Sequence, residues 1–182
     1  MGLAAKLKRL ATWPGRAYRR RSDPVGYARS LGVRVGKGCR FLGRVHFGTE
    51  PYLITIGDRV SISDGSVILT HDGGVWAIRE ESPDADIFAP VTIGSNVFIG
   101  ARVTVLPGAV IGDNCVIGTG SVVVGEIPPD SVAAGIPAKV IRPIEEYKAK
   151  CRDKALHVRS LPRDVLRRKL IEHFGLDEDE QP

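Results

Sequence analysis

The sequence IGSNVF-IGARVT-VLPGAV-IGDNCV-IGTGSV-V, residues 93–123, repeats every six residues. The first position of each repeat is always aliphatic and β-branched: Ile93, Ile99, Val105, Ile111, Ile117 and Val123. Glycine follows this position in four of the repeats, and the fifth position is small or aliphatic. A period of six fits neither the 3.6 residues of a helical turn nor the two-residue alternation of a simple strand.

The period instead predicts a parallel β-helix with triangular coils, in which each side carries one repeat and a coil takes about 18 residues. The aliphatic residue points inward and stacks on its equivalent one coil later, and the glycine relieves crowding at a corner. The pattern recurs upstream at Ile56, Ile62 and Ile68, and more faintly at Val35, Phe41 and Phe47. Cys39 and Cys115 fall on fifth positions, so we expect them to be small core residues.

Two irregular segments interrupt the repeat: a short one at 48–52 and a long excursion at 72–90. Long loops on a regular scaffold usually carry function. The chain is therefore predicted to consist of a basic N-terminal segment, 1–32, a β-helix domain, 33–143, that contains the excursion loop, and a C-terminal helical extension, 144–182. Short helices are expected at 3–12, 23–31, 144–156 and 162–174.

Composition narrows the class of protein. A chain of 182 residues with 43% hydrophobic content suits one soluble domain with short appendages, and it has no apolar run long enough to span a membrane. Its three cysteines are widely spaced and form no Cys-x-x-Cys, which indicates reduced thiols in a cytoplasmic protein and neither a zinc site nor a disulfide framework.

The net charge of +5 is unevenly placed, because residues 1–22 hold seven Lys and Arg and no acidic residue. This segment lacks the aromatic residues and the fold of a nucleic-acid reader, so we expect no nucleic acid as partner. We expect instead a salt-sensitive attraction to anionic polysaccharide or to anionic lipid, which would make the protein peripheral at the inner face of the membrane.

Several strings resemble the hexapeptide-repeat O-acetyltransferases, the group that includes the maltose, galactoside and virginiamycin acetyltransferases. They are IGSNVFIG at 93–100, LPGAVIGDN at 106–114, VIGTGSVV at 116–123 and, as the most specific signal, AAGIPAKVIR at 133–142. The strings GTEPYLI at 48–54 and THDGGVW at 70–76 are similar to the branch that acts on bacterial surface polysaccharides. The resemblance covers about residues 33–143. It implies a left-handed β-helix, a homotrimer with its site between subunits, acetyl-CoA as donor without a metal, and a sugar or polysaccharide precursor as acceptor.

In the resembled family a histidine that opens the excursion loop acts as general base, and the matching residue is His71. The chemistry agrees, because a sugar hydroxyl attacks a thioester well only while a base removes its proton, and neutral imidazole suits that task. A catalytic imidazole also needs an acceptor on its other nitrogen. Glu50 is one candidate, since it precedes His71 by one coil plus three residues; its alternative is a solvent-facing corner carboxylate. Asp72 is the second candidate.

Donor binding in the resembled family uses main-chain groups beside small residues. The matching positions here are Gly100, Ala101, Gly118 and Thr119, although ordinary corner geometry would produce the same glycines. Lys139 and Arg142 match basic residues near the coenzyme A phosphates. Where relatives often carry Thr-Lys after the last repeat, this chain has Val124-Gly125, so one phosphate contact is missing or comes from elsewhere, for example an N-terminal arginine of a neighbouring subunit.

The remaining assignments stay open at this stage. Trp76 either stacks on a sugar face or anchors the loop against a neighbour, and Asp72 is a further candidate for acceptor binding. The oxyanion donor is a backbone N–H near Ala101 or within 71–75. Two other functions compete: a non-catalytic β-helix scaffold, which failure to bind coenzyme A would favour, and a γ-type carbonic anhydrase. The latter needs three zinc-binding histidines, and the repeat region holds only His46 and His71.

Overall fold

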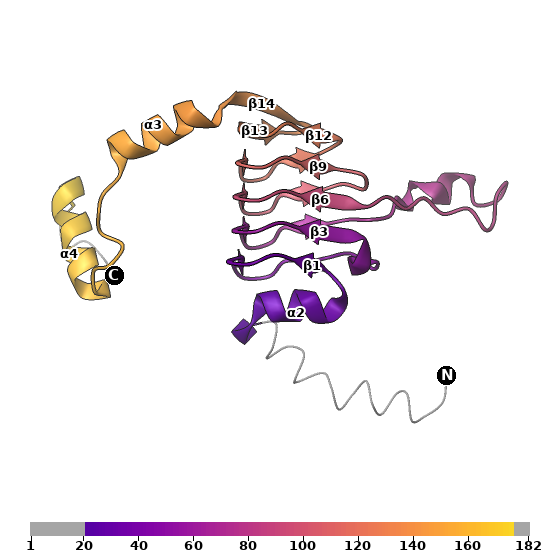
Figure 1. The fold of residues 1–182 in the computed structure, drawn as a ribbon, viewed down its shortest axis with the longest axis horizontal. Helices are drawn as coiled ribbons and strands as arrows, with labels where there is room; N and C mark the ends of the chain where they lie inside the picture. Colours follow the sequence, from indigo (N-terminus) through magenta and orange to yellow (C-terminus); the bar gives the residue numbers. More distant parts are fainter. Residues whose placement is uncertain (1–20, 177–182) are drawn as a thin grey trace. The chain divides into compact units, whose positions relative to one another are not determined.

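Short strands build three sheets, parallel within the coils, that wind around one axis (Figure 1). A computed structural model describes residues 21–176. The first sheet contains β1 (Arg34–Val35), β3 (Ile54–Ile56), β6 (Val91–Ile93), β9 (Val110–Ile111) and β12 (Glu126–Ile127). The second contains β2 (Arg40–Phe41), β4 (Ser61–Ile62), β7 (Phe98–Ile99), β10 (Val116–Ile117), β13 (Ser131–Gly135) and β14 (Ala138–Pro143). The third contains β5 (Val67–Ile68), β8 (Thr104–Val105) and β11 (Val122–Val123).

The strand register confirms the predicted coil length. Ile93 pairs with Ile111 in the first sheet, Ile99 with Ile117 in the second and Val105 with Val123 in the third, and each pair is separated by three six-residue repeats. The predicted parallel β-helix is therefore confirmed over these coils. The sequence folds this way because the side chains of the coil strands alternate between outward and inward, so that the β-branched first residue of each repeat is buried.

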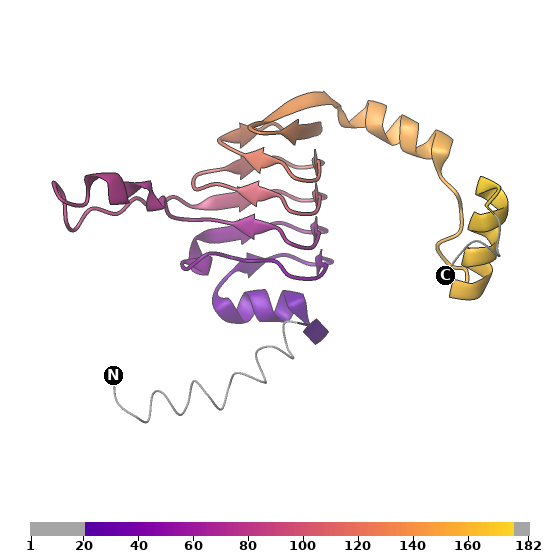
Figure 2. The same cartoon turned by 180° about the vertical axis from the view of Figure 1, so that it is seen from behind.

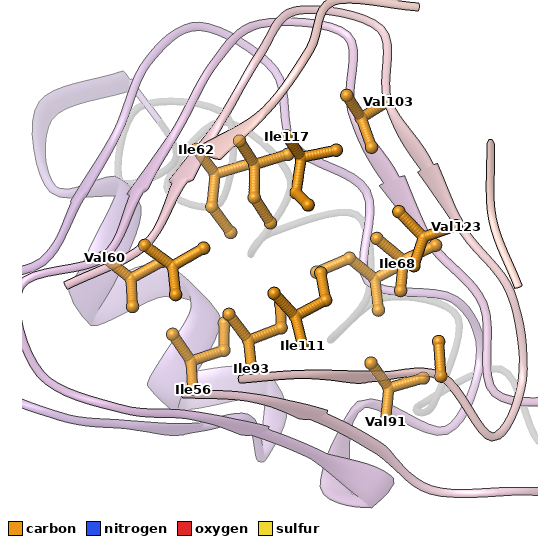
Figure 3. Packing of buried hydrophobic residues seen from close by; sticks show 14 of the residues in the cluster. Ile56, Val60, Ile62, Ile68, Val91, Ile93, Val103, Ile111, Ile117 and Val123 are labelled. Atoms are coloured by element: carbon orange, nitrogen blue, oxygen red, sulfur yellow. The ribbon is translucent and has the colours of Figure 1, made fainter. Parts of the chain in front are cut away.

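The core consists of columns of these inward residues. Figure 3 shows Ile56, Ile93 and Ile111 in one column, each contributed by a successive coil, and each is at most 2% exposed. The fifth-position residues fill the corners between columns, and Cys115 among them is 1% exposed, as predicted. Burial raises the pKa of the Cys115 thiol. Cys39 is half-buried and packs against the same core.

Different elements cover the two ends of the coil stack. Helix α2 (Pro24–Leu31) packs on the first coil through the fully buried Ala28, and Asp23 accepts a hydrogen bond from the N–H of Gly26 at its N-terminus. At the other end β13 pairs in parallel with β10, and β14 folds back antiparallel on β13. The helix expected at 23–31 is thus confirmed, whereas the one expected at 3–12 lies outside the described residues.

The C-terminal part is helical, with α3 (Ile144–Lys154) and α4 (Arg163–Phe174), close to the predicted bounds. The described residues divide into two compact units after Tyr147, so α3 begins in the first unit and continues into the second. The predicted extents of the three segments remain predictions. Among residues 21–176 there is no helix that combines the length and the apolar character needed to cross a membrane.

Two irregular segments lie where the chain passes from the third sheet to the first. The shorter one carries the 3-10 helix η1 (Pro51–Leu53) ahead of β3. The longer one leaves the coils after β5, carries the 3-10 helix η2 (Gly73–Ile78) and returns at β6. Figures 1 and 2 show it as an arm that projects from the stacked coils. The arm coincides with the excursion loop that the broken repeat predicts.

Candidate active site

His71 lies at the base of this arm, where two short backbone segments run antiparallel. It pairs with Phe88 as an isolated bridge, the N–H of Asp72 donates to the carbonyl of Ile87 at 2.9 Å, and that of Ala89 donates to the carbonyl of Thr70 at 2.9 Å. The rings of His71 and Phe88 are 6.2 Å apart at their centroids. The arm therefore begins with a fixed backbone at the histidine rather than with a free loop.

Glu50 comes from the corner one coil earlier, immediately before η1. Its Oε2 lies 3.1 Å from Nδ1 of His71. The hydroxyl of Thr70 donates to the same Oε2 at 3.0 Å, and the Thr49 hydroxyl lies 3.2 Å from Nδ1 of His71. The structure thus brings together the two residues that coil arithmetic places one turn and three residues apart, in a cluster of two hydroxyls, a carboxylate and an imidazole.

The electrostatics of this cluster define the state of the ring. Hydrogen bonds from the Thr49 hydroxyl, the Thr70 hydroxyl and the His71 ring lower the pKa of Glu50, with that of Thr49 the largest effect. Together they more than offset desolvation, which raises this pKa. An ionised carboxylate can only accept hydrogen bonds, so Nδ1 of His71 is the donor in their contact. Both side-chain contacts of the ring run through Nδ1, which leaves Nε2 without a partner among residues 21–176. In the neutral ring that nitrogen carries the lone pair and is the basic one.

Both groups retain access to solvent, with side-chain exposures of 17% for Glu50 and 39% for His71. Such partial exposure lets a bound molecule reach the ring while the carboxylate stays behind it. The arrangement suits proton abstraction by Nε2, because the carboxylate stabilises the imidazolium that forms.

Asp72 and Trp76 occupy the arm but do not join this cluster. Asp72 precedes η2, where its Oδ1 accepts a hydrogen bond from the N–H of Gly74 at 2.8 Å. The acceptor that contacts His71 is therefore Glu50 rather than Asp72. Trp76 lies within η2 and is 78% exposed. Its indole therefore presents a broad apolar surface on the arm.

The predicted donor-binding residues lie at another corner, between the second and third sheets. Gly100 and Ala101 stack against the next coil: a Cβ on Gly100 would lie 2.6 Å from the backbone nitrogen of Thr119, and the N–H of Gly120 donates to Ala101 at 2.9 Å. A Cβ on Gly118 would likewise lie 2.8 Å from that of Ala134. Close stacking thus requires these glycines whether or not a ligand binds there.

Lys139 and Arg142 both lie on β14, where Lys139 is exposed and Arg142 half-buried. The glycine corner precedes β8, whereas the corner that carries His71 follows β5 in the neighbouring coil of the same sheet. The third sheet therefore separates His71 from Gly100 within one chain. One chain alone does not place the predicted base and the predicted donor residues at one corner.

Thr49 and Thr70 are site residues that the sequence reasoning missed. Each immediately precedes a predicted site residue, in the pairs Thr49-Glu50 and Thr70-His71, and this repetition in stacked corners was the available signal. Among the other histidines, His46 is exposed, and its Nδ1 accepts a hydrogen bond from the N–H of Gly48 at 3.2 Å. No group of three or more His, Cys, Asp or Glu in the described part of the chain could hold a metal ion.

Comparison with known proteins identifies the family of this chain. The family model of the bacterial transferase hexapeptide, with six repeats, matches residues 90–125. Protein CapG of Staphylococcus aureus is 45% identical over 135 residues, which make up 73% of this chain and 78% of CapG. The chain belongs to the hexapeptide-repeat acetyltransferases. The family predicted from the sequence motifs is thereby confirmed, and so is its fold class, the left-handed β-helix.

Other hexapeptide-repeat acetyltransferases extend the comparison. The galactoside O-acetyltransferase of Escherichia coli K12 is 43% identical over 124 residues, or 68% of this chain, and the chain spans 60% of the length of that relative. The structure of a galactoside acetyltransferase in complex with coenzyme A superposes with a TM-score of 0.53 at 28% identity, over 88% of this chain and 90% of the other.

Proposed function

We propose that the protein transfers an acetyl group from acetyl-CoA to a hydroxyl of a sugar, in a bacterial surface polysaccharide or its precursor, with His71 as general base. The observation that carries this proposal is the 3.1 Å contact between Nδ1 of His71 and Oε2 of Glu50, which leaves Nε2 for the acceptor. Family membership, the galactoside and CapG relatives and the coenzyme A complex of a family member support the reaction class.

The reaction then runs in two steps. Nε2 takes the proton of the acceptor hydroxyl while the hydroxyl oxygen attacks the thioester carbonyl. Glu50 stabilises the imidazolium that results. The tetrahedral intermediate collapses with loss of the coenzyme A thiolate, which receives the proton back from the ring. A backbone N–H near Ala101 or within residues 71–75 stabilises the negative oxygen in between.

Donor binding completes the site through a second subunit. The pantetheine arm lies along the corner formed by Gly100, Ala101, Gly118 and Thr119. Lys139 and Arg142 pair with its phosphates, which need fixed positive charge. Because the third sheet separates this corner from His71 within one chain, the base of one subunit works on the donor held by its neighbour in a homotrimer.

The acceptor binds along the arm beside His71. The exposed indole of Trp76 offers a flat apolar surface of the kind on which pyranose rings stack. Asp72 retains one carboxylate oxygen that does not cap η2 and that accepts from a sugar hydroxyl. The same proposal places the reaction in the cytoplasm, where the anionic inner face of the membrane attracts the basic N-terminal segment 1–32. Residues 1–20 of that segment lie outside the described structure.

Incubation of the full chain with radiolabelled acetyl-CoA and a panel of nucleotide-linked and lipid-linked sugars tests this function. The expected result is label in at least one sugar, with loss of the label under mild alkali as expected of an ester. Tight binding of coenzyme A without any transfer across the panel would contradict the acceptor class. Failure to bind coenzyme A at all would contradict the enzyme assignment and favour a scaffold.

A further inference from the structure

Thr70 is a fully buried polar residue in direct contact with the carboxylate behind the proposed base. Its side chain is 0% exposed, and its hydroxyl donates to Oε2 of Glu50 at 3.0 Å. That oxygen is the one that accepts from Nδ1 of His71. Thr70 therefore supports Glu50 from the interior of the molecule, while His71 contacts it from the solvent side.

The backbone around Thr70 leaves its hydroxyl little freedom. The N–H of Leu69 donates to Val105 in the next coil, and the carbonyl of Thr70 accepts from Ala89 across the base of the arm, each at 2.9 Å. A β-branched side chain also has few χ1 rotamers on a fixed backbone. The hydroxyl is therefore a preset donor that does not need to be ordered when a substrate binds.

The corner that carries Glu50 is shaped to approach Thr70 closely. Gly48 has a left-handed φ of 60°, and a Cβ there would lie 3.2 Å from the carbonyl of Ile68 and 3.4 Å from the Thr70 hydroxyl. A larger residue would be strained in this conformation and would push the corner outward. Gly48 thus allows the two coils to close on the contact between Thr70 and Glu50.

We propose that Thr70 is a positioning residue for acetyl transfer. It holds Oε2 of Glu50 where that oxygen accepts a hydrogen bond from the N–H at Nδ1 of His71. This inference rests on the proposed function and adds to it a residue that never touches the substrate. Thr49 also lowers the pKa of Glu50, but it makes a weaker candidate for positioning, because it is exposed and its hydroxyl lies 3.2 Å from Nδ1 of His71.

The physical effect concerns the carboxylate rather than the stability of the core. Loss of the hydroxyl leaves the Glu50 carboxylate with the Thr49 hydroxyl and the His71 ring as its side-chain partners. The support from the buried side is then gone, and Glu50 is free to rotate toward water. Valine matches the shape of threonine and carries no polar group that needs a partner, so the fold tolerates it better than it would tolerate a buried donor without an acceptor.

Thr70→Val and Thr70→Ser test the inference, with Thr92→Val as matched control. Thr92 is exposed on β6 in the first sheet and takes no part in the hydrogen bonds of the cluster described above. We expect Thr70→Val to lower kcat about 10-fold, as for loss of a hydrogen bond to a charged group, with KM for acetyl-CoA unchanged. Thr70→Ser keeps the hydroxyl and should stay within about threefold of wild type, as should the control.

A double-mutant cycle shows whether Thr70 acts through Glu50. Thr70→Val in the Glu50→Gln background should cause no further loss, because the oxygen that it positions no longer carries the charge. Independent, multiplicative losses would overturn the inference, as would a Thr70→Val enzyme with wild-type kcat. If Thr70→Val does not fold, a 10-fold loss in the folded Ser variant would overturn it equally. An inactive wild-type enzyme, in contrast, would refute the proposed function itself.

Discussion

Ile111→Ala tests the inward register of the coils most quantitatively. Ile111 is 1% exposed, pairs with Ile93 and stands in the column shown in Figure 3. The substitution removes the carbon atoms beyond Cβ, at about 0.8 kcal/mol for each buried carbon. A fixed backbone between two coils collapses poorly around the resulting cavity, so the loss in unfolding free energy should reach about 3–5 kcal/mol.

Val110→Ala is the matched control, because Val110 precedes Ile111 on β9 but points outward and is 41% exposed. Its loss should be about 1 kcal/mol or less, since part of the removed surface already contacts water. Urea unfolding of both variants at one protein concentration measures the difference, because association of subunits would otherwise shift the midpoint. Equal losses for the two variants would refute the inward assignment of Ile111.

Three further outcomes are expected. Ile99→Asp should yield no cooperatively folded protein on circular dichroism, because a buried carboxylate without a partner costs several kcal/mol; a soluble variant of wild-type stability would contradict the register. Combined Lys139→Ala and Arg142→Ala should raise KM for acetyl-CoA about 10-fold and spare kcat, since they act on binding alone; an unchanged KM in steady-state assays would remove them from the donor site. Hydrogen bonds lower the pKa of Glu50 in the folded protein, so its stabilising effect is present above the unfolded pKa and is lost as pH falls through the folded one. The difference in Tm between wild type and Glu50→Gln should therefore shrink as the pH falls. A difference that grows in acid would contradict the lowered pKa of Glu50.

The repeat predicted much of the fold because the burial of the first and fifth residues of each repeat has a simple geometric cause. Once Ile93, Ile99 and Ile117 define the period, the sheet of each repeat follows, and so does the close approach of Glu50 to the coil of His71. The same arithmetic explains why Cys115 is buried although its thiol suggests chemistry.

The six-residue repeat could not predict the side-chain contacts within the site. Asp72 is next to His71 in sequence, yet it caps η2, because a carboxylate before a helical turn meets the free N–H groups of that turn. The pairs Thr49-Glu50 and Thr70-His71 marked Thr70 in the sequence, but the contact of its hydroxyl with Glu50 depends on the shape of the corner at Gly48. Spacing predicts which coils are neighbours, whereas the rotamers that select one hydrogen-bond partner depend on the packed backbone.

The central claim is that His71 is the base that Glu50 orients, and His71→Ala tests it most directly. Acetyl transfer and coenzyme A affinity should be measured on the same preparation, by labelled acetyl-CoA assay and by calorimetry, with His173→Ala as control because His173 is exposed on α4. We predict a fall in kcat of about 10²–10⁴-fold, with coenzyme A affinity nearly unchanged and the control unaffected. Retention of more than about a tenth of wild-type turnover, well outside that range, would contradict the account.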